Sequence, residues 1–476
     1  MTAATRPATA RRPPSGTAAE LAAQVLGRSA EPRRPPEPGW LRAARRRAAA
    51  WVEDHGFPST KHEDWRYTKI DAALAVPLGA PPESAAGGGA SVSVGDLIGP
   101  HLGGARIVVV NGRVDAALSS TGGAPPAGVL VESLAGALHR LDGGLEPSWL
   151  WRAGGYPHAL RAMNDAAAVD GVLIDLAPGT VVEDPIEVVF ATAGHPRWSH
   201  LRVVVVAGSG ASATLVETYL SGPGGPSVTN ALTQVHLGAD AQLAHHVLQG
   251  EHRDSFHFSS LEARLAEGSR LSSRLLATGG RIGRHEVDVV LAGEGADVDL
   301  DGLFLTGAGQ QHDNPVLVDH AAPRCTSRQL YKGVVSGDGH GVFNGHLLVR
   351  PGADGTDAAQ VNKNLLLSER AEVDTRPRLE INADDVACSH GAAVGQLDPD
   401  ALFYLRSRGV SEREARAVLV SGFAREVIDR FGSGPIRQRA EELAMAAGVI
   451  ALDEDGHSDG AVTAATTRAR RGGRPQ

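Results

Sequence analysis

Several residue types that build metal or nucleotide sites are scarce or missing in this chain. It has two cysteines, Cys325 and Cys388, among 476 residues, and no Cys-x-x-Cys pair. Two isolated thiols exclude a disulfide framework for a chain of this size, and they exclude a metal site built only from its own thiolates. No Gly-Lys dipeptide occurs either, which excludes a phosphate-binding P-loop and the ATPase chemistry that depends on it.

Long apolar runs and a strong positive charge are also missing. The longest apolar runs, such as 203–207, are far too short to span a bilayer, and the N-terminus shows no apolar core of a secretion signal. The formal net charge is −9, which argues against nucleic acid as the main partner. Together with the few cysteines, these features predict a cytoplasmic protein that binds neither membrane nor nucleic acid.

Composition and patterning divide the chain into five predicted regions. Aromatic residues make up only 4% while glycine is abundant at 58 residues, a balance typical of turn-rich β structure. Alternating apolar residues, which predict strands, dominate one long central stretch. The predicted regions are a disordered Ala/Pro/Arg-rich tail (1–38), a mixed helical region (39–170), a β core (171–396), a helical domain (397–454) and a second disordered tail (455–476).

Within the β core, one kind of turn recurs at a nearly constant interval. A glycine followed by a small residue or threonine stands at Gly179, Gly210, Gly238, Gly268 and Gly295, with spacings of 31, 28, 30 and 27 residues. Such a period is typical of stacked coils. Each coil is expected to hold two or three strands of five to seven residues. We therefore predict a mainly β fold, a parallel β-helix or β-solenoid; an antiparallel sandwich is the alternative.

After residue 396 the pattern changes from strand-like to helical. Asp398 is suited to cap one helix, and Ser411 with Glu414 forms a capping box for the next. That second helix carries an apolar stripe between Ala415 and Val427. Because a short helical unit hanging off the end of a solenoid buries little on its own, the stripe is interpreted either as core packing or as a docking surface.

The same boundary carries the best candidate for chemistry, Cys388 and His390. With one residue between them on a strand, both side chains point to the same face and can reach one metal ion. Thiolate and imidazole suit iron or zinc. An iron–sulfur cluster takes about four ligands, so the others must come from a partner or another segment. The alternative interpretation is a small buried cysteine beside a turn histidine.

Two further groups carry weaker signals. Cys325 has His312 and His320 nearby in sequence, but it is interpreted as a structural thiol in a strand. A run of histidines is interpreted as lying on solvated strand faces and not as a metal site. Its members are His236, His245, His246, His252 and His257.

Four long segments resemble one known family. They are Lys61–Thr68 (KHEDWRYT), His320–Gly345 (HAAPRCTSRQLYKGVVSGDGHGVFNG), Arg350–Asp398 (beginning RPGADGTDAAQVNKN) and Ala401–Gly409 (ALFYLRSRG). On these motifs the chain is similar to the SufB/SufD family, the scaffold subunits of the Suf iron–sulfur cluster assembly machinery. The strand end ADDVACSHGAAVGQLD resembles the SufD branch, whereas SufB-like chains carry a Glu-rich variant there.

The resemblance has implications for fold, partners and site. It implies a right-handed parallel β-helix between N- and C-terminal helical regions, in a non-enzymatic scaffold that joins SufB and two copies of the ATPase SufC. SufB would pair with the β-helix edge near residues 377–396, and SufC, which hydrolyses ATP, would dock on the C-terminal helices, 398–446. Cys388 and His390 map onto a site for transient iron or a nascent cluster shared with SufB. Family complexes are also associated with a reduced flavin, at a site that does not map onto this sequence.

A function of another class, a polysaccharide-active enzyme built on a β-helix, would use clustered carboxylates on one solenoid face. Such a cluster is suggested by Glu294, Asp297, Asp299 and Asp301. The lack of a visible secretion signal and the fit of the family motifs argue against it.

Lysine is rare in this chain, whereas arginine is abundant. The four lysines, Lys61, Lys69, Lys332 and Lys363, all lie in or beside family-like segments. Since ammonium and guanidinium groups differ in geometry, we predict that an ammonium is specifically needed at Lys332 and Lys363.

Overall fold

The computed structural model describes most of the chain outside its two ends. The described residues are 20–21, 23–24, 37–78, 94–120, 127–140, 155–194, 197–222 and 225–449. The predicted tail 455–476 lies outside them, as does nearly all of the predicted tail 1–38. Within the described residues, no helix is long and apolar enough to cross a membrane.

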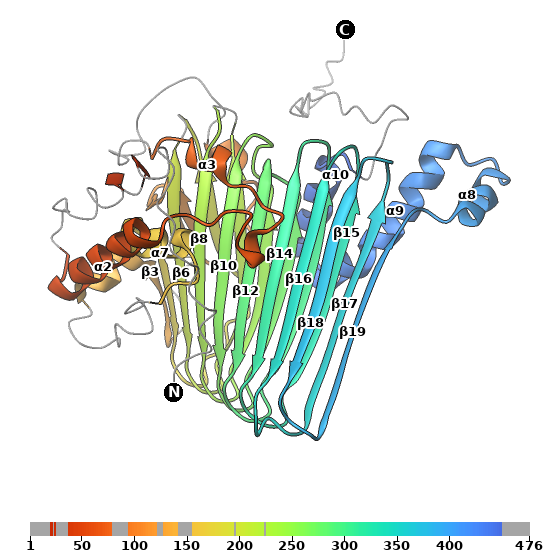
Figure 1. Ribbon diagram of the computed structural model, residues 1–476. Helices are drawn as coiled ribbons and strands as arrows, with labels where there is room; N and C mark the ends of the chain where they lie inside the picture. Colours follow the sequence, from red (N-terminus) through yellow and green to blue (C-terminus); the bar gives the residue numbers. More distant parts are fainter. Residues whose placement is uncertain are drawn as a thin grey trace, which may run out of the picture.

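Two large sheets face each other at the centre of the molecule (Figure 1). The chain alternates between them, so each coil contributes one strand to each sheet. Sheet A has the order β2-β1-β5-β7-β9-β11-β13-β15-β17-β19, and sheet B has the order β3-β4-β6-β8-β10-β12-β14-β16-β18. From β4 onward, neighbouring strands within a sheet are parallel. This arrangement confirms the predicted β-solenoid and excludes the antiparallel sandwich.

The elements follow the chain in simple alternation. The strands are β1 Arg106–Val110, β2 Arg113–Val114, β3 Val129–Ser133, β4 Val172–Leu176, β5 Ile186–Thr192, β6 Trp198–Ala207, β7 Ser212–Ser221, β8 Val228–Leu237, β9 Gln242–Gln249, β10 Phe256–Leu265, β11 Arg270–Ala277, β12 Ile282–Leu291, β13 Asp297–Thr306, β14 Gln311–His320, β15 Thr326–Val335, β16 His340–Val349, β17 Thr356–Leu366, β18 Glu372–Ile381 and β19 Val386–Gly395. The helices are α2 Gly39–His55, η1 Glu63–Trp65, α3 Asp71–Leu74, α4 Val94–Leu97, α5 Leu134–Arg140, α7 Ala159–Ala167, α8 Pro399–Arg406, α9 Glu412–Ile428, η2 Asp429–Phe431 and α10 Pro435–Ala446.

Each coil holds two strands, most of them eight to eleven residues long. Two strands per coil agree with the expected two or three, but the expected strand length of five to seven residues was too short. Residues that interrupt an apolar pattern lie inside continuous strands here, as Pro315 does in β14 and Gly345 in β16. Sequence patterning divides such strands because it treats proline and glycine as strand ends.

The turns that lead from sheet B to sheet A form a ladder along one side of the solenoid. Seven successive turns of this kind, all but the last one, between β18 and β19, share a residue in the left-handed region with φ between 57° and 74°: Gly179, Gly210, Asp240, Gly268, Gly295, Arg324 and Gly355. Its N–H donates to a carbonyl of the next coil, as from Gly268 to Glu294 at 2.9 Å. Gly238 was wrongly assigned this role, which Asp240 takes. Gly238 is instead a close-approach site, because a Cβ there would lie 2.8 Å from the Ser209 nitrogen.

The two helical regions cover opposite outer faces of the solenoid (Figure 1). Helices α2 and α7 pack on sheet B, and α9 and α10 fold back onto sheet A. The idea that the C-terminal unit hangs off the end and buries little is therefore wrong for α9 and α10. On α9, Ala415 and Val427 are buried against the sheet, whereas Val418 is 56% exposed. Helix α8 has no buried residue and projects beyond the sheets.

The two ends of the solenoid differ. At the N-terminal end, β2 pairs antiparallel with β1, and β3 pairs antiparallel with β4. At the other end, β18 and β19 are the outermost strands, and no described strand pairs with their outer edges.

Candidate functional site

Cys388 and His390 both lie on β19, the outermost strand of sheet A. In the parallel register Cys388 is opposite Ala358, and His390 is opposite Gln360. Ala358 belongs to the apolar cluster between the sheets, and Cys388 packs against that cluster. His390 lies two residues further along the strand, so its side chain projects to the same, inward side.

Sheet B forms the opposite wall of this region. On β18, Pro377 is opposite Gly345, and Leu379 is opposite Leu347. Leu379 also packs against the apolar cluster between the sheets. We call the inward-facing end formed by Pro377, Leu379, Cys388 and His390 the open mouth of the solenoid.

The electrostatics of the open mouth keep the cysteine protonated. Partial burial raises the pKa of the Cys388 thiol, and the carboxylate of Asp357 raises it further. Metal binding must therefore displace the thiol proton. His390 is exposed. No group of three or more His, Cys, Asp or Glu side chains is placed to hold a metal ion anywhere in the described ranges. The two predicted ligands, Cys388 and His390, are therefore not joined by a third such side chain within the described residues.

The other cysteine, Cys325, does not lie at the open mouth of the solenoid. Cys325 is buried in the solenoid, and its Sγ donates to the Gly293 carbonyl at 3.3 Å. Burial raises the pKa of this thiol. His312 and His320 are buried and bond to other partners, including the Gly279 carbonyl and the Ser327 hydroxyl. The three side chains do not form a metal site. Cys325 is a buried structural thiol as interpreted, but it stands in the turn immediately before β15 and not within a strand.

Several histidines of the run near residue 245 are in the interior, which corrects their assignment to solvated strand faces. His245 and His257 are 1% and 0% exposed. His257 Nδ1 lies 2.7 Å from Glu251. Burial lowers the pKa of His246, which follows His245 on β9 and faces the outer side of sheet A, to about 3. Both faces of each sheet are covered here, so alternation alone did not identify the inner one.

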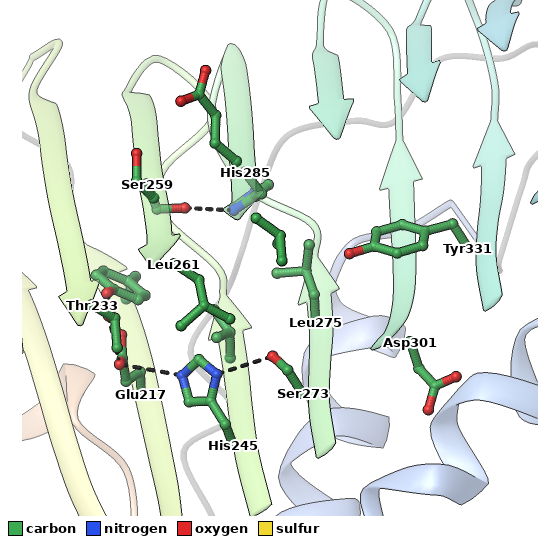
Figure 2. A pocket seen from close by; sticks show the side chains of 15 residues that line it. Glu217, Thr233, His245, Ser259, Leu261, Ser273, Leu275, His285, Asp301 and Tyr331 are labelled. Carbon is green, nitrogen blue, oxygen red and sulfur yellow. Dashed lines mark hydrogen bonds and ion pairs between the residues drawn. The ribbon is translucent and has the colours of Figure 1, made fainter. Parts of the chain in front are cut away.

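A small cavity between the sheets brings three polar groups of successive coils together (Figure 2). His245 lies with Nε2 3.2 Å from Glu217 and Nδ1 3.0 Å from the Ser273 hydroxyl. The order carboxylate, imidazole, hydroxyl is that of a hydrolase triad. The cavity measures only about 40 Å³, enough for about two or three water molecules. It cannot admit a substrate beside these groups, so we interpret them as a buried polar network.

Three of the four carboxylates that suggested a polysaccharide enzyme form ion pairs. Asp297 lies 2.9 Å from Arg270, and Asp301 lies 2.7 Å from Arg430 of η2. Glu294 pairs with Arg324. Asp301 is moreover only 2% exposed. Carboxylates held in ion pairs with arginine do not form the free acid and base pair of a glycosidase.

Comparison with known proteins finds family models that match both the N-terminal part and the central part of the chain. A family model described as "SUF system FeS cluster assembly, SufBD core domain" matches residues 189–423, and one for the "SufBD protein N-terminal region" matches residues 36–188. The chain is 31% identical to the iron–sulfur cluster assembly protein SufD of Escherichia coli over 393 residues, which cover 81% of this chain and 88% of that protein. It is 28% identical to a SufBD family protein of Synechocystis, covering 81% and 86%. It is also 28% identical to SufD of Bacillus subtilis, covering 57% and 63%.

Proposed function

Because the chain belongs to the SufBD family of iron–sulfur cluster assembly proteins, we propose that it is a non-enzymatic scaffold subunit of a Suf assembly complex. Cys388 and His390 hold iron or a nascent cluster as cargo, and a SufB-like partner supplies the remaining ligands. The observation that carries this proposal is the coincidence of the two ligands with the open mouth. A strand edge without a partner is a ready template for another sheet.

The partner surfaces follow from the same geometry. The SufB-like partner pairs with the uncovered edge near residues 377–396 and completes the metal site across the seam. A SufC-type ATPase docks on the helices of 398–446, and it supplies the P-loop ATP hydrolysis for which this chain has no motif. Helix α8 supports the second contact, because Phe403 is 74% and Tyr404 is 56% exposed. Exposed aromatic side chains of this kind are enriched in protein interfaces.

The test uses the complex produced by co-expression of the chain with its two partners. His390→Ala and Cys388→Ala are expected to assemble normally and to lower the yield of cluster, measured by iron and sulfide content and by absorbance. His252→Ala, a half-exposed histidine in a loop far along the chain from β19, is the matched control and should keep the wild-type yield. Wild-type yield from both site variants would overturn the proposal.

A further inference from the structure

One buried side chain directly behind His390 has no hydrogen-bond partner. Gln360 on β17 is 1% exposed, and neither its amide oxygen nor its amide nitrogen is bonded. Buried amides without partners are rare, because burial removes them from water without compensation. Gln360 is opposite His390 in the parallel register, so the two side chains leave neighbouring strands about 4.8 Å apart toward the same interior.

The amide of Gln360 has room because of a glycine on the facing sheet. A Cβ added at Gly345 would collide with the Gln360 amide nitrogen. The amide therefore reaches across the interior from sheet A to sheet B, one coil below the open mouth. Gly345 closes the segment GVFNG and is opposite Pro377 in the open mouth. The glycine thus keeps space for a polar side chain beneath Cys388 and His390.

A histidine that binds a metal through one ring nitrogen needs an acceptor for the N–H of the other. We propose that Gln360 is that acceptor: a positioning residue whose amide oxygen takes the His390 ring N–H and fixes the tautomer and orientation for iron binding. This inference rests on the proposed function. Because neither amide atom is bonded, turning toward His390 breaks no hydrogen bond.

The chain contains its own matched control. Gln329 occupies the same column one coil deeper, opposite Gln360, and is 3% exposed with neither amide atom bonded. It has the same chemistry but does not neighbour His390. Gln360→Met and Gln329→Met each replace an amide by an unbranched side chain of similar size. Gln360→Glu retains an acceptor oxygen.

The experiment is a Co²⁺ titration of the full chain, followed by thiolate-to-cobalt absorbance, with thermal unfolding measured in parallel. We expect Gln360→Met to weaken Co²⁺ binding about tenfold, and Gln329→Met and Gln360→Glu to stay within about twofold of wild type. Equal affinities for the two Met variants, or a Glu variant as weak as Gln360→Met, would overturn the role of Gln360. Cys388→Ala and His390→Ala report on the proposed function separately: if neither changes the titration, the metal site itself is wrong.

Discussion

The two ends of the solenoid are built from the same coil but finish differently. At the N-terminal end the interior is apolar, with Val172, Ile174, Val203 and Val205 buried. There, β2 and β3 run antiparallel to the first parallel strands, β1 and β4, and cover the outer edges of both sheets. At the C-terminal end no strand among the described residues covers the last parallel strands, and polar side chains such as Gln360 enter the interior.

The N-terminal end of the solenoid is closed by the chain itself. The C-terminal end, at β18 and β19, is the surface that we propose a partner covers, and we call it the joint. A parallel coil always leaves unpaired backbone groups on its outer edge, and natural proteins cover such edges to avoid uncontrolled pairing. Here the cover at one end is part of the chain, whereas the other end has the proposed ligands Cys388 and His390 and no described cover. Under the proposed function, a partner at this end would supply both the next strands and the remaining ligands.

The largest expected effect comes from placing a charge at each end in turn. Val394 on β19 is 45% exposed and Leu130 on β3 is 40% exposed. Val394→Arg should weaken association with a SufB-like partner about 100-fold, because the charge would be buried without a counter-ion in the joint. Leu130→Arg should leave the affinity within about twofold. Calorimetric titration with the purified partner measures both, and equal losses would contradict the distinction between the ends.

Acid is expected to destabilise the coil of β14, which buries His312 and His320, before the apolar coils of β4 and β6. Burial lowers the pKa of His312 and His320 to about 4, whereas an unfolded histidine titrates near 6.5. Below pH 6.5 the unfolded chain therefore binds protons that the folded chain excludes, and stability falls as pH falls. The two histidines together should cost about 4 kcal/mol between pH 7 and pH 5.

Hydrogen exchange at pH 7 and pH 5 checks this prediction by region. Amides of β14 should lose protection on acidification before those of β4 and β6. His320→Gln should remove about half of the acid-induced loss of stability in urea unfolding. An unchanged loss in that variant, or earlier opening of β4, would contradict the assignment.

A smaller effect is expected where α9 is fixed to sheet A. Lys332 is 3% exposed, and its Nζ donates to the Phe423 carbonyl at 2.7 Å and to Glu426 at 2.6 Å. Lys332→Arg should cost about 1–3 kcal/mol, because the larger planar group overfills the site. Its neighbour Lys363 is exposed, so Lys363→Arg should change stability by less than about 0.5 kcal/mol. Thermal unfolding of both variants decides whether the ammonium is needed at one position or at both.

The smallest effect is expected where the N-terminal region reaches the open end. Glu63 lies 2.9 Å from Arg376 on β18, but the two side chains are 71% and 38% exposed. Solvent-exposed ion pairs contribute little, so Glu63→Gln should cost less than about 0.5 kcal/mol and leave partner affinity unchanged. A loss of affinity comparable to that of Val394→Arg would mean that the N-terminal region helps to form the joint.

Local features of the fold were predictable from sequence. The turn period indicated the solenoid because left-handed turn positions favour glycine wherever the coil repeats. The Asp398 cap and the Ser411–Glu414 capping box are present as predicted, since both depend on residues within one helical turn. The side chains buried inside the solenoid were not predictable. The inward position of His245, and the space that Gly345 leaves for Gln360, depend on pairing between strands of different coils and sheets.

The sequence by itself determined the turn period, the helix caps and a candidate site with only two ligands, because φ preferences, caps and neighbouring side chains act over a few residues. Only the tertiary structure decided which face of each strand lies inside, that α9 returns to cover sheet A, and that Cys388 and His390 lie at the one end without a described cover. The physical reason is that burial and edge pairing are set by residues about one coil or more apart, which no local pattern records.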